Sequence, residues 1–175
     1  MSPRPTACAW CGRSRSTHGL SWGKTLLNPD YRDILSAFSD EGVEYLLVGA
    51  YALAAHGLPR STGDIDLWVL ASPANAERVL RALARFGAPL DDLSAADFTR
   101  PDSVVQIGVP PRRIDILTSV AGLSFQDAWP RRLDVVIDGI GIPVLGRADQ
   151  AVNKRAVGRP QDLADAAWLE GKTDP

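Results

Sequence analysis

The stretch STGDIDLWVL, Ser61 to Leu70, places two aspartates inside a segment that otherwise has the composition of a buried strand. In a β-strand, residues i and i+2 point to the same face, so the carboxylates of Asp64 and Asp66 would lie about 6–7 Å apart on one face. Like charges at that separation are costly unless a cation neutralises them. The first question that the sequence raises is therefore what lies between these two aspartates.

A third aspartate occurs in the same setting. In RIDILT, Arg113 to Thr118, Asp115 alternates with two isoleucines. Buried acids are rarely unpaired. Three carboxylates without soft ligands favour a hard divalent cation, Mg²⁺ or Mn²⁺. Two such ions can hold both the attacking and the leaving oxygen of a phosphoryl displacement.

Two alternatives remain open for these acids. Asp64 and Asp66 would lie on the solvent face of an edge strand if Ile65 and Leu67 faced the core. The second alternative is that the acids belong to a two-metal phosphohydrolase. Such enzymes usually use histidines as metal ligands, and the chain has only His18 and His56. His56 ends a short helical segment, where a ring bonded to the backbone is the structural expectation.

The segments around the aspartates alternate between helix and strand patterns. Capping residues followed by proline, Asn28-Pro29 and Ser72-Pro73, predict two helices with apolar stripes. Strands are expected at Val43–Val48, 64–70, 104–109, 113–118, 132–137 and 142–146, and further helices at 50–56, 125–129, 148–157 and 160–169. This order predicts one α/β (α+β) domain, 29–170, with a mixed β-sheet, flanking helices and a C-terminal helical pair.

Composition fits a single domain without membrane spans. The 175 residues are 45% hydrophobic and 23% charged, and the net charge of -2 argues mildly against nonspecific nucleic-acid binding. No apolar run approaches the 18–20 or so residues of a membrane helix, and no secretory signal is expected, because the N-terminal residues lack an apolar h-region. Two cysteines are too few for a disulfide scaffold, so a reducing, cytoplasmic compartment is expected.

Both ends of the chain are expected to lie outside the domain. Residues 1–28 read as a disordered basic arm, although an organellar transit peptide has the same arginine bias. This arm contains Cys8 and Cys11 in CAWC, which lacks the further ligands that zinc normally needs. Residues 171–175 read as a tail.

The central segment VGAYALAAHGLPRSTGDIDLWV, Val48 to Val69, resembles the signature of the polymerase β-like nucleotidyltransferase superfamily. In that superfamily a strand leads into a Gly-Gly or Gly-Ser turn and a short helix, followed by a strand with Asp-x-Asp. The chain is most similar to the bacterial minimal nucleotidyltransferases, which include the AbiEii-like toxins of abortive-infection and toxin–antitoxin systems. The resemblance covers roughly Tyr31 to Leu169, including ADQAVNKRAVGRPQDLADAAWL at its end.

The resemblance implies a catalytic centre for transfer of a nucleoside monophosphate. Asp64 and Asp66 would hold Mg²⁺ or Mn²⁺, and Asp115 would complete the metal site and help to deprotonate the acceptor hydroxyl. Lys154 would neutralise phosphate charge. Catalysis of this kind consists mostly of positioning and charge stabilisation.

The resemblance also implies a nucleotide-binding set. Gly49 and Ala50 would form the turn whose N–H groups face the phosphates, while Arg60 and Thr62 would contact the phosphates or stay structural. The family usually has Gly or Ser where this chain has Ala50, so no hydroxyl is available there and the backbone is limited to negative φ.

Other charged residues have structural alternatives. Lys154 is one of only three lysines beside 16 arginines, and it either serves the phosphates or lies on a solvated helix face. Asp162 and Asp165 suit the first turns of a helix and could pair with neighbouring cations. Arg112 and Arg113 either contact substrate or form a charged hairpin tip.

The leading hypothesis is thus a Mg²⁺-dependent nucleotidyltransferase that moves an NMP from an NTP to a hydroxyl of RNA such as tRNA, of a protein or of a small molecule. It could be the toxin or the antitoxin of a two-component system, with a cognate partner. The alternative is a non-catalytic nucleotide- or partner-binding module with a degraded fold, which Ala50 favours slightly and the three intact aspartates oppose.

Overall fold

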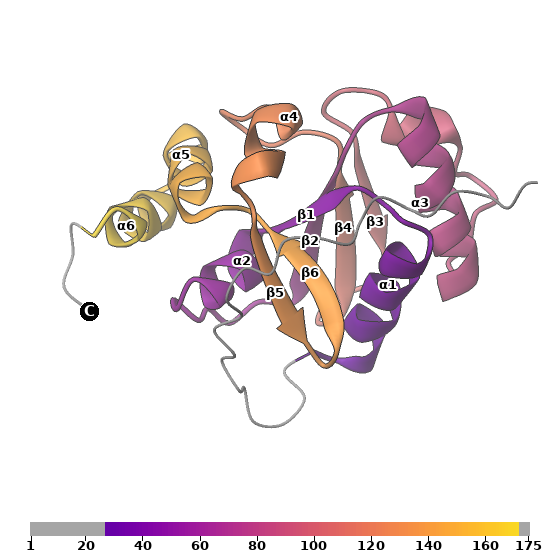
Figure 1. Ribbon diagram of the computed structural model, residues 1–175, viewed down its shortest axis with the longest axis horizontal. Helices are drawn as coiled ribbons and strands as arrows, with labels where there is room; N and C mark the ends of the chain where they lie inside the picture. The colour runs from indigo at the N-terminus through magenta and orange to yellow at the C-terminus, as the bar shows by residue number, and fades with distance from the viewer. Residues whose placement is uncertain (1–26, 172–175) are drawn as a thin grey trace, which may run out of the picture.

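The computed structural model describes residues 27–171, and the structural statements below concern that part of the chain. Its strands are β1 (Tyr45–Val48), β2 (Asp64–Val69), β3 (Val104–Ile107), β4 (Arg113–Leu117), β5 (Leu133–Ile137) and β6 (Ile140–Val144). They form one six-stranded sheet in the order β3-β4-β2-β1-β6-β5. The sheet is mixed, because β2 pairs parallel with β4 and β1 parallel with β6, while the other neighbours are antiparallel (Figure 1).

The helices surround this sheet. They are α1 (Pro29–Asp40), α2 (Gly49–Ala55), α3 (Pro73–Phe86), α4 (Phe125–Ala128), α5 (Arg147–Val157) and α6 (Pro160–Leu169), with 3₁₀ helices η1 (Ala95–Phe98) and η2 (Trp129–Arg131). Both predicted caps are present: the side chains of Asn28 and Ser72 accept hydrogen bonds from the backbone N–H groups of Tyr31 and Asn75. Each cap is followed by proline, whose fixed φ suits the first helical position.

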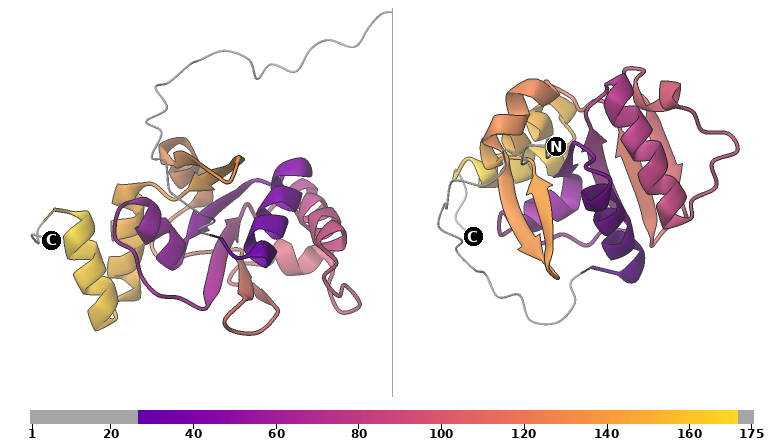
Figure 2. Two further views of the ribbon diagram at one scale, coloured as in Figure 1. Left: turned by 90° about the horizontal axis from the view of Figure 1, so that it is seen from below. Right: turned by 45° about the vertical axis from the view of Figure 1, so that its right-hand side comes forward.

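Alternation along β2 separates two hydrophobic layers. Ile65, Leu67 and Val69 are fully buried in the larger core, which α1 and α3 cover (Figure 2). Residues 64, 66 and 68 point to the other face of the sheet. There Trp68 packs edge-on against Phe125 of α4, with 5.1 Å between ring centroids. Along β2 this smaller layer ends at Trp68; its last member on β1 is Val48, the register partner of Asp66, so the two aspartates lie at its edge.

Strand β2 lies inside the sheet. It pairs with β1 on one side and with β4 on the other. The interpretation of Asp64 and Asp66 as residues of an edge strand is therefore wrong, and both side chains project from the interior of a sheet.

The C-terminal helices lie beside α2 rather than over the main sheet. Leu53 of α2 is buried against Ala151 of α5 and Leu169 of α6, and the figure shows the three helices grouped at one end of the molecule (Figure 1). This contact places residues about 100 positions later in the sequence against α2, the helix between β1 and β2.

The predicted architecture is confirmed: a mixed α/β sheet with flanking helices and a C-terminal helical pair. The last strand begins at Ile140 instead of Ile142, because Asp138 and Gly139 both take positive φ and form a two-residue hairpin turn between β5 and β6. The cysteines of the predicted arm lie outside the described residues, whereas Leu27 within that arm is buried in the core. Within residues 27–171 no helix is both long enough and apolar enough to cross a bilayer.

Candidate active site

The three aspartates meet on one face of the sheet because β2 and β4 run parallel and in register. Asp66 pairs with Asp115, and Asp64 pairs with Arg113. Paired residues on neighbouring strands point to the same face, about 5 Å apart. Asp64, Asp66 and Asp115, called the carboxylate cluster below, are thereby assembled from segments about 50 residues apart.

Arg113 lies inside this cluster. Its Nε donates to Oδ1 of Asp115 at 2.8 Å and its Nη2 to Oδ2 of Asp115 at 2.9 Å, a bidentate pair. The same Nη2 lies 2.5 Å from Oδ2 of Asp64. Arg113 is thus not at a hairpin tip, and its guanidinium bridges two of the three predicted metal ligands.

Two neutral side chains complete the shell around these carboxylates. The hydroxyl of Thr62 donates to Oδ1 of Asp64 at 2.5 Å. Gln106 of β3 is the register partner of Asp115, and its Nε2 lies 3.5 Å from Oδ2 of that residue, at the limit of a hydrogen bond. All four carboxylate oxygens of Asp64 and Asp115 therefore face donors.

Asp66 has a different environment. Its carboxylate has no hydrogen-bond or ion-pair partner among residues 27–171. Burial, together with the charges of Asp64 and Asp115, raises the pKa of Asp66 to about 6. Lys154 and Arg113 act on Asp66 only through their charges and make no hydrogen bond or ion pair with it, so its carboxylate is open to a bound cation.

The glycine turn touches Asp66 directly. Gly49 starts α2 with φ of +65°, and a Cβ atom placed on it would overlap Oδ2 of Asp66 and lie 2.9 Å from its Cγ. Ala50 is not among the positive-φ residues of the described chain, so the left-handed conformation falls on Gly49 and Ala50 causes no backbone strain. The side-chain amide of the fully buried Gln150 donates to the Gly49 carbonyl at 3.1 Å and ties α5 to the turn.

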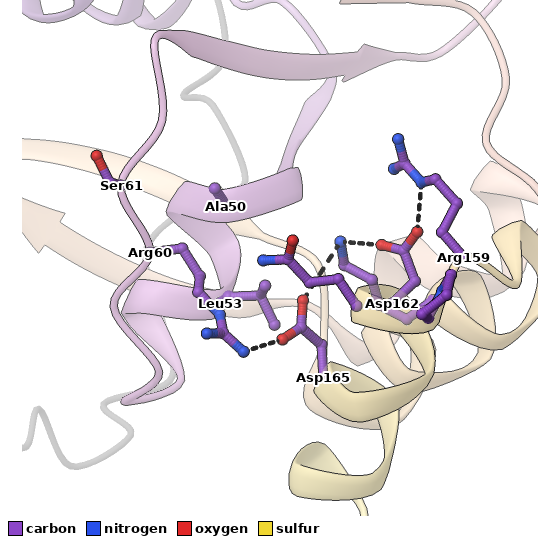
Figure 3. A pocket seen from close by; sticks show the side chains of 10 residues that line it. Ala50, Leu53, Arg60, Ser61, Arg159, Asp162 and Asp165 are labelled. Carbon is purple, nitrogen blue, oxygen red and sulfur yellow. Dashed lines mark hydrogen bonds and ion pairs between the residues drawn. The ribbon is translucent and has the colours of Figure 1, made fainter.

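A pocket of about 460 Å³ opens beside this turn, between α2 and the C-terminal helices. Ala50 and Leu53 form one side, as the close view shows (Figure 3). Its charged lining consists of three cations and two acids: Arg60, Lys154, Arg159, Asp162 and Asp165. The lining therefore carries a formal charge of +1, which favours an anionic ligand.

The two acids of the pocket are almost fully buried and organise the cations. Nζ of Lys154 lies 2.8 Å from Oδ1 of Asp162 and 3.9 Å from Oδ2 of Asp165. Arg159 pairs with the other oxygen of Asp162 at 2.6 Å, and Arg60 pairs with Asp165. The expectation that Asp162 and Asp165 pair with neighbouring cations is confirmed.

Lys154 links the pocket to the carboxylate cluster. Only 13% of its side chain is exposed, so the interpretation as a solvated-face lysine is wrong. Its positive charge also acts on Asp66 and offsets part of the rise in the pKa of that residue. The ammonium group therefore lies within electrostatic reach of both sites.

The structure places every predicted site residue at the cluster or at the pocket. The cluster holds Asp64, Asp66 and Asp115 with Thr62 and Gly49 in contact, and the pocket is lined by Ala50, Arg60 and Lys154. Their roles in binding and catalysis stay predictions. His56 has the structural role expected, since its Nε2 lies 2.8 Å from the carbonyl oxygen of Leu145.

The donor set suits a hard cation by its chemistry, since it offers only carboxylate oxygens and the Asp66 carboxylate is open to a cation. In the present arrangement no group of three or more His, Cys, Asp or Glu side chains within residues 27–171 is positioned to hold a metal ion. In this arrangement Asp64 and Asp115 instead accept hydrogen bonds from Arg113. Sequence reasoning missed the contacts of Arg113 with Asp64 and of Gln150 with Gly49, because each joins distant segments. The i, i+2 spacing of Arg113 and Asp115 on one strand was a signal that could have placed Arg113 beside Asp115.

No protein-family model and no curated protein matches the sequence. Among solved structures, the chain is similar to a protein from Thermotoga maritima named as a putative nucleotidyltransferase, with a TM-score of 0.57, 18% identity, and coverage of 83% of this chain and 96% of that one. It also matches ANT(2″)-Ia in complex with adenylyl-2″-tobramycin, at a TM-score of 0.47, 13% identity and coverage of 79% and 84%. We take the fold from the first match alone, and by that match the chain has a nucleotidyltransferase-like fold.

Proposed function

We propose that the protein is a metal-dependent nucleotidyltransferase that transfers an NMP from an NTP to a hydroxyl acceptor. The observation that carries this proposal is the in-register placement of Asp64 and Asp66 on β2 beside Asp115 on β4, with the Gly49 turn packed against Asp66. Acids gathered on one face of an internal strand pair cost stability unless they serve a cation. The fold supports the same chemistry.

Each group has a separate task in this proposal. Asp64, Asp66 and Asp115 would hold Mg²⁺ or Mn²⁺, which when bound neutralises phosphate charge as the phosphorus–oxygen bond is exchanged. A cluster carboxylate accepts the proton of the acceptor hydroxyl. Lys154 supplies positive charge to the phosphates from α5, with its position fixed by Asp162.

The pocket beside the turn is the proposed nucleotide site. It lies next to Ala50 and contains the charge-paired set of Arg60, Lys154 and Arg159, of which Arg60 and Arg159 are open to solvent. An NTP whose phosphates reach the cluster would place the rest of the nucleotide along α2. Arginine pairs with phosphate bidentately, and lysine acts as a compact charge.

The acceptor belongs to this proposal as a class, a hydroxyl on RNA, on a protein or on a small molecule. A role as the toxin or the antitoxin of an AbiEii-like pair, with a cognate partner in the cytoplasm, is part of the same hypothesis. It rests on the sequence resemblance.

The decisive experiment incubates the protein with each α-labelled NTP and Mg²⁺, with total tRNA and cell extract as acceptors. We expect label on one acceptor class with the wild type and none with the Asp64→Ala, Asp66→Ala double variant. The Asp91→Ala, Asp92→Ala variant is the matched control, since it removes two exposed neighbouring carboxylates outside the site. Equal labelling by all three proteins would contradict the proposal.

A non-catalytic binding module is the second candidate. The observation that favours it is Arg113, which pairs with Asp64 and Asp115 and offsets one of the three cluster charges without a metal ion. NTP binding to the pocket without transfer of label to any acceptor would support this candidate instead.

A further inference from the structure

Arg113 occupies the site that the proposed function assigns to a cation. It is the register partner of Asp64 and precedes Asp115 by two residues on the same strand, so β-geometry alone directs its side chain onto the carboxylate face. Its guanidinium makes three contacts of 2.5 to 2.9 Å with Asp64 and Asp115. The present inference rests on the proposed function and concerns how the metal enters this site.

We propose that Arg113 is an internal counter-cation that competes with the metal ion, so that divalent cations bind the cluster only when its guanidinium leaves Asp64 and Asp115.

Charge and geometry make the two occupants exclusive. The cluster carries three carboxylates, and Arg113 offsets one of these charges at close range. A divalent ion that takes oxygens from both Asp64 and Asp115 would lie within a few ångströms of the guanidinium, where like charges repel strongly in a partly buried site. Its ligands would also have to give up hydrogen bonds that Arg113 now donates.

The surroundings of Arg113 allow its guanidinium to leave Asp64 and Asp115. Its side chain is 28% exposed, as is that of Asp64, whereas that of Asp115 is 9% exposed, so solvent reaches Arg113 from the side of Asp64. Within residues 27–171 the side chain of Arg113 donates hydrogen bonds only to Asp64 and Asp115, and no backbone carbonyl there anchors it. Rotation about its side-chain bonds can therefore release the guanidinium without a change in the strands.

Asp66 favours replacement of the Arg113 guanidinium by a metal ion. Arg113 donates no hydrogen bond to Asp66, whereas a divalent cation could take an oxygen from this carboxylate together with the other two. A nucleotide would assist, because its phosphates offer the released guanidinium a new bidentate partner.

The test measures Mn²⁺ binding to the nucleotide-free protein by electron paramagnetic resonance, with calorimetry as a second readout. We expect Arg113→Gln to bind Mn²⁺ at least about tenfold more tightly than the wild type, since a neighbouring arginine shifts the proton affinity of a carboxylate by about 1–3 pKa units through the same electrostatics. Arg113→Lys keeps the positive charge but loses the bidentate geometry of the guanidinium, so its Mn²⁺ affinity should lie between those of the wild type and Arg113→Gln.

Arg112→Gln is the matched control. It removes the same charge one residue away, from a side chain that is 65% exposed and lies 3.7 Å from Asp30. We expect its Mn²⁺ affinity to stay within about twofold of the wild type. Circular dichroism of each variant checks that the sheet is intact, and Arg113→Lys keeps the test valid if Arg113→Gln does not fold.

The outcomes separate this inference from the proposed function. Equal Mn²⁺ affinity in the wild type and Arg113→Gln, abolished in both by Asp66→Asn, would overturn the competition and leave the metal site standing. An equal gain in Arg112→Gln would also overturn it, because the effect would then be one of net charge. No Mn²⁺ binding by any of the proteins would overturn both the competition and the metal-dependent function.

Discussion

Gly49 and Asp66 lie so close that residue 49 has no room for a side chain. A Cβ atom there would overlap Oδ2 of Asp66, and the backbone of Gly49 is in the left-handed region at φ +65°. Two independent constraints, steric and conformational, thus require glycine at the point where β1 turns into α2. The conformation of the Gly49 turn and the position of the Asp66 carboxylate therefore depend on each other.

Replacement of Gly49 by alanine should therefore cost more than the backbone conformation alone. We expect Gly49→Ala to lower the free energy of unfolding by clearly more than the 1–2 kcal/mol or so that a left-handed non-glycine residue costs. Urea unfolding measures this loss. The Gly49→Ala substitution should also reduce NMP transfer, because the side chain of Asp66 must move to make room for the new Cβ atom.

Gly42→Ala is the control for this prediction. Gly42 has almost the same φ, +64°, but a Cβ atom there would meet nothing within 4 Å. In an Asp66→Ala background the cost of Gly49→Ala should fall towards that of Gly42→Ala. If the two alanine variants were equally stable in the wild-type background, the contact between Gly49 and Asp66 would not constrain the fold.

The stability of the metal-free protein should depend on pH through Asp66. Its pKa is raised from 3.8 to about 6, so the folded state binds more protons than the unfolded state between these values. Stability linked to this group is then fully present below about pH 4 and is lost as the pH rises through 6. Each pKa unit corresponds to about 1.4 kcal/mol, so up to about 3 kcal/mol is at stake.

The Asp66→Asn variant isolates this contribution. Unfolding in urea with a chelator present should show similar stability of variant and wild type near pH 4, and an advantage for Asp66→Asn that grows up to pH 7. Titrating groups that do not interact with Asp66 cancel in the difference, whereas Asp64 and Asp115 interact with it and contribute to the measured difference. A difference that stays constant across this range would show that Asp66 does not titrate as its surroundings require.

The elements of this fold could be read from the sequence where the signals are local. Asn28-Pro29 and Ser72-Pro73 mark helix starts, and the period-two alternation around Asp64 and Asp115 marks strands that carry acids. What the sequence did not reveal depends on register between distant segments. Arg113 meets Asp64 across 49 residues and Gln150 meets Gly49 across 101, and no local pattern specifies such pairs.

Lys154 is expected to support both the pocket and the phosphates. Lys154→Met would leave the nearly buried Asp162 and Asp165 with one arginine partner each. The cost should therefore stay below the roughly 3 kcal/mol of an uncompensated buried charge. NTP affinity, measured by calorimetry, should fall at least about tenfold.

Arg155→Met is the control for this prediction. Arg155 pairs with Glu170 at the surface, where loss of an ion pair costs about 1 kcal/mol of stability or less. The NTP affinity of this variant should equal that of the wild type. Equal losses of NTP affinity in both variants would show that Lys154 contributes only through the net charge of α5 and not through its place in the pocket.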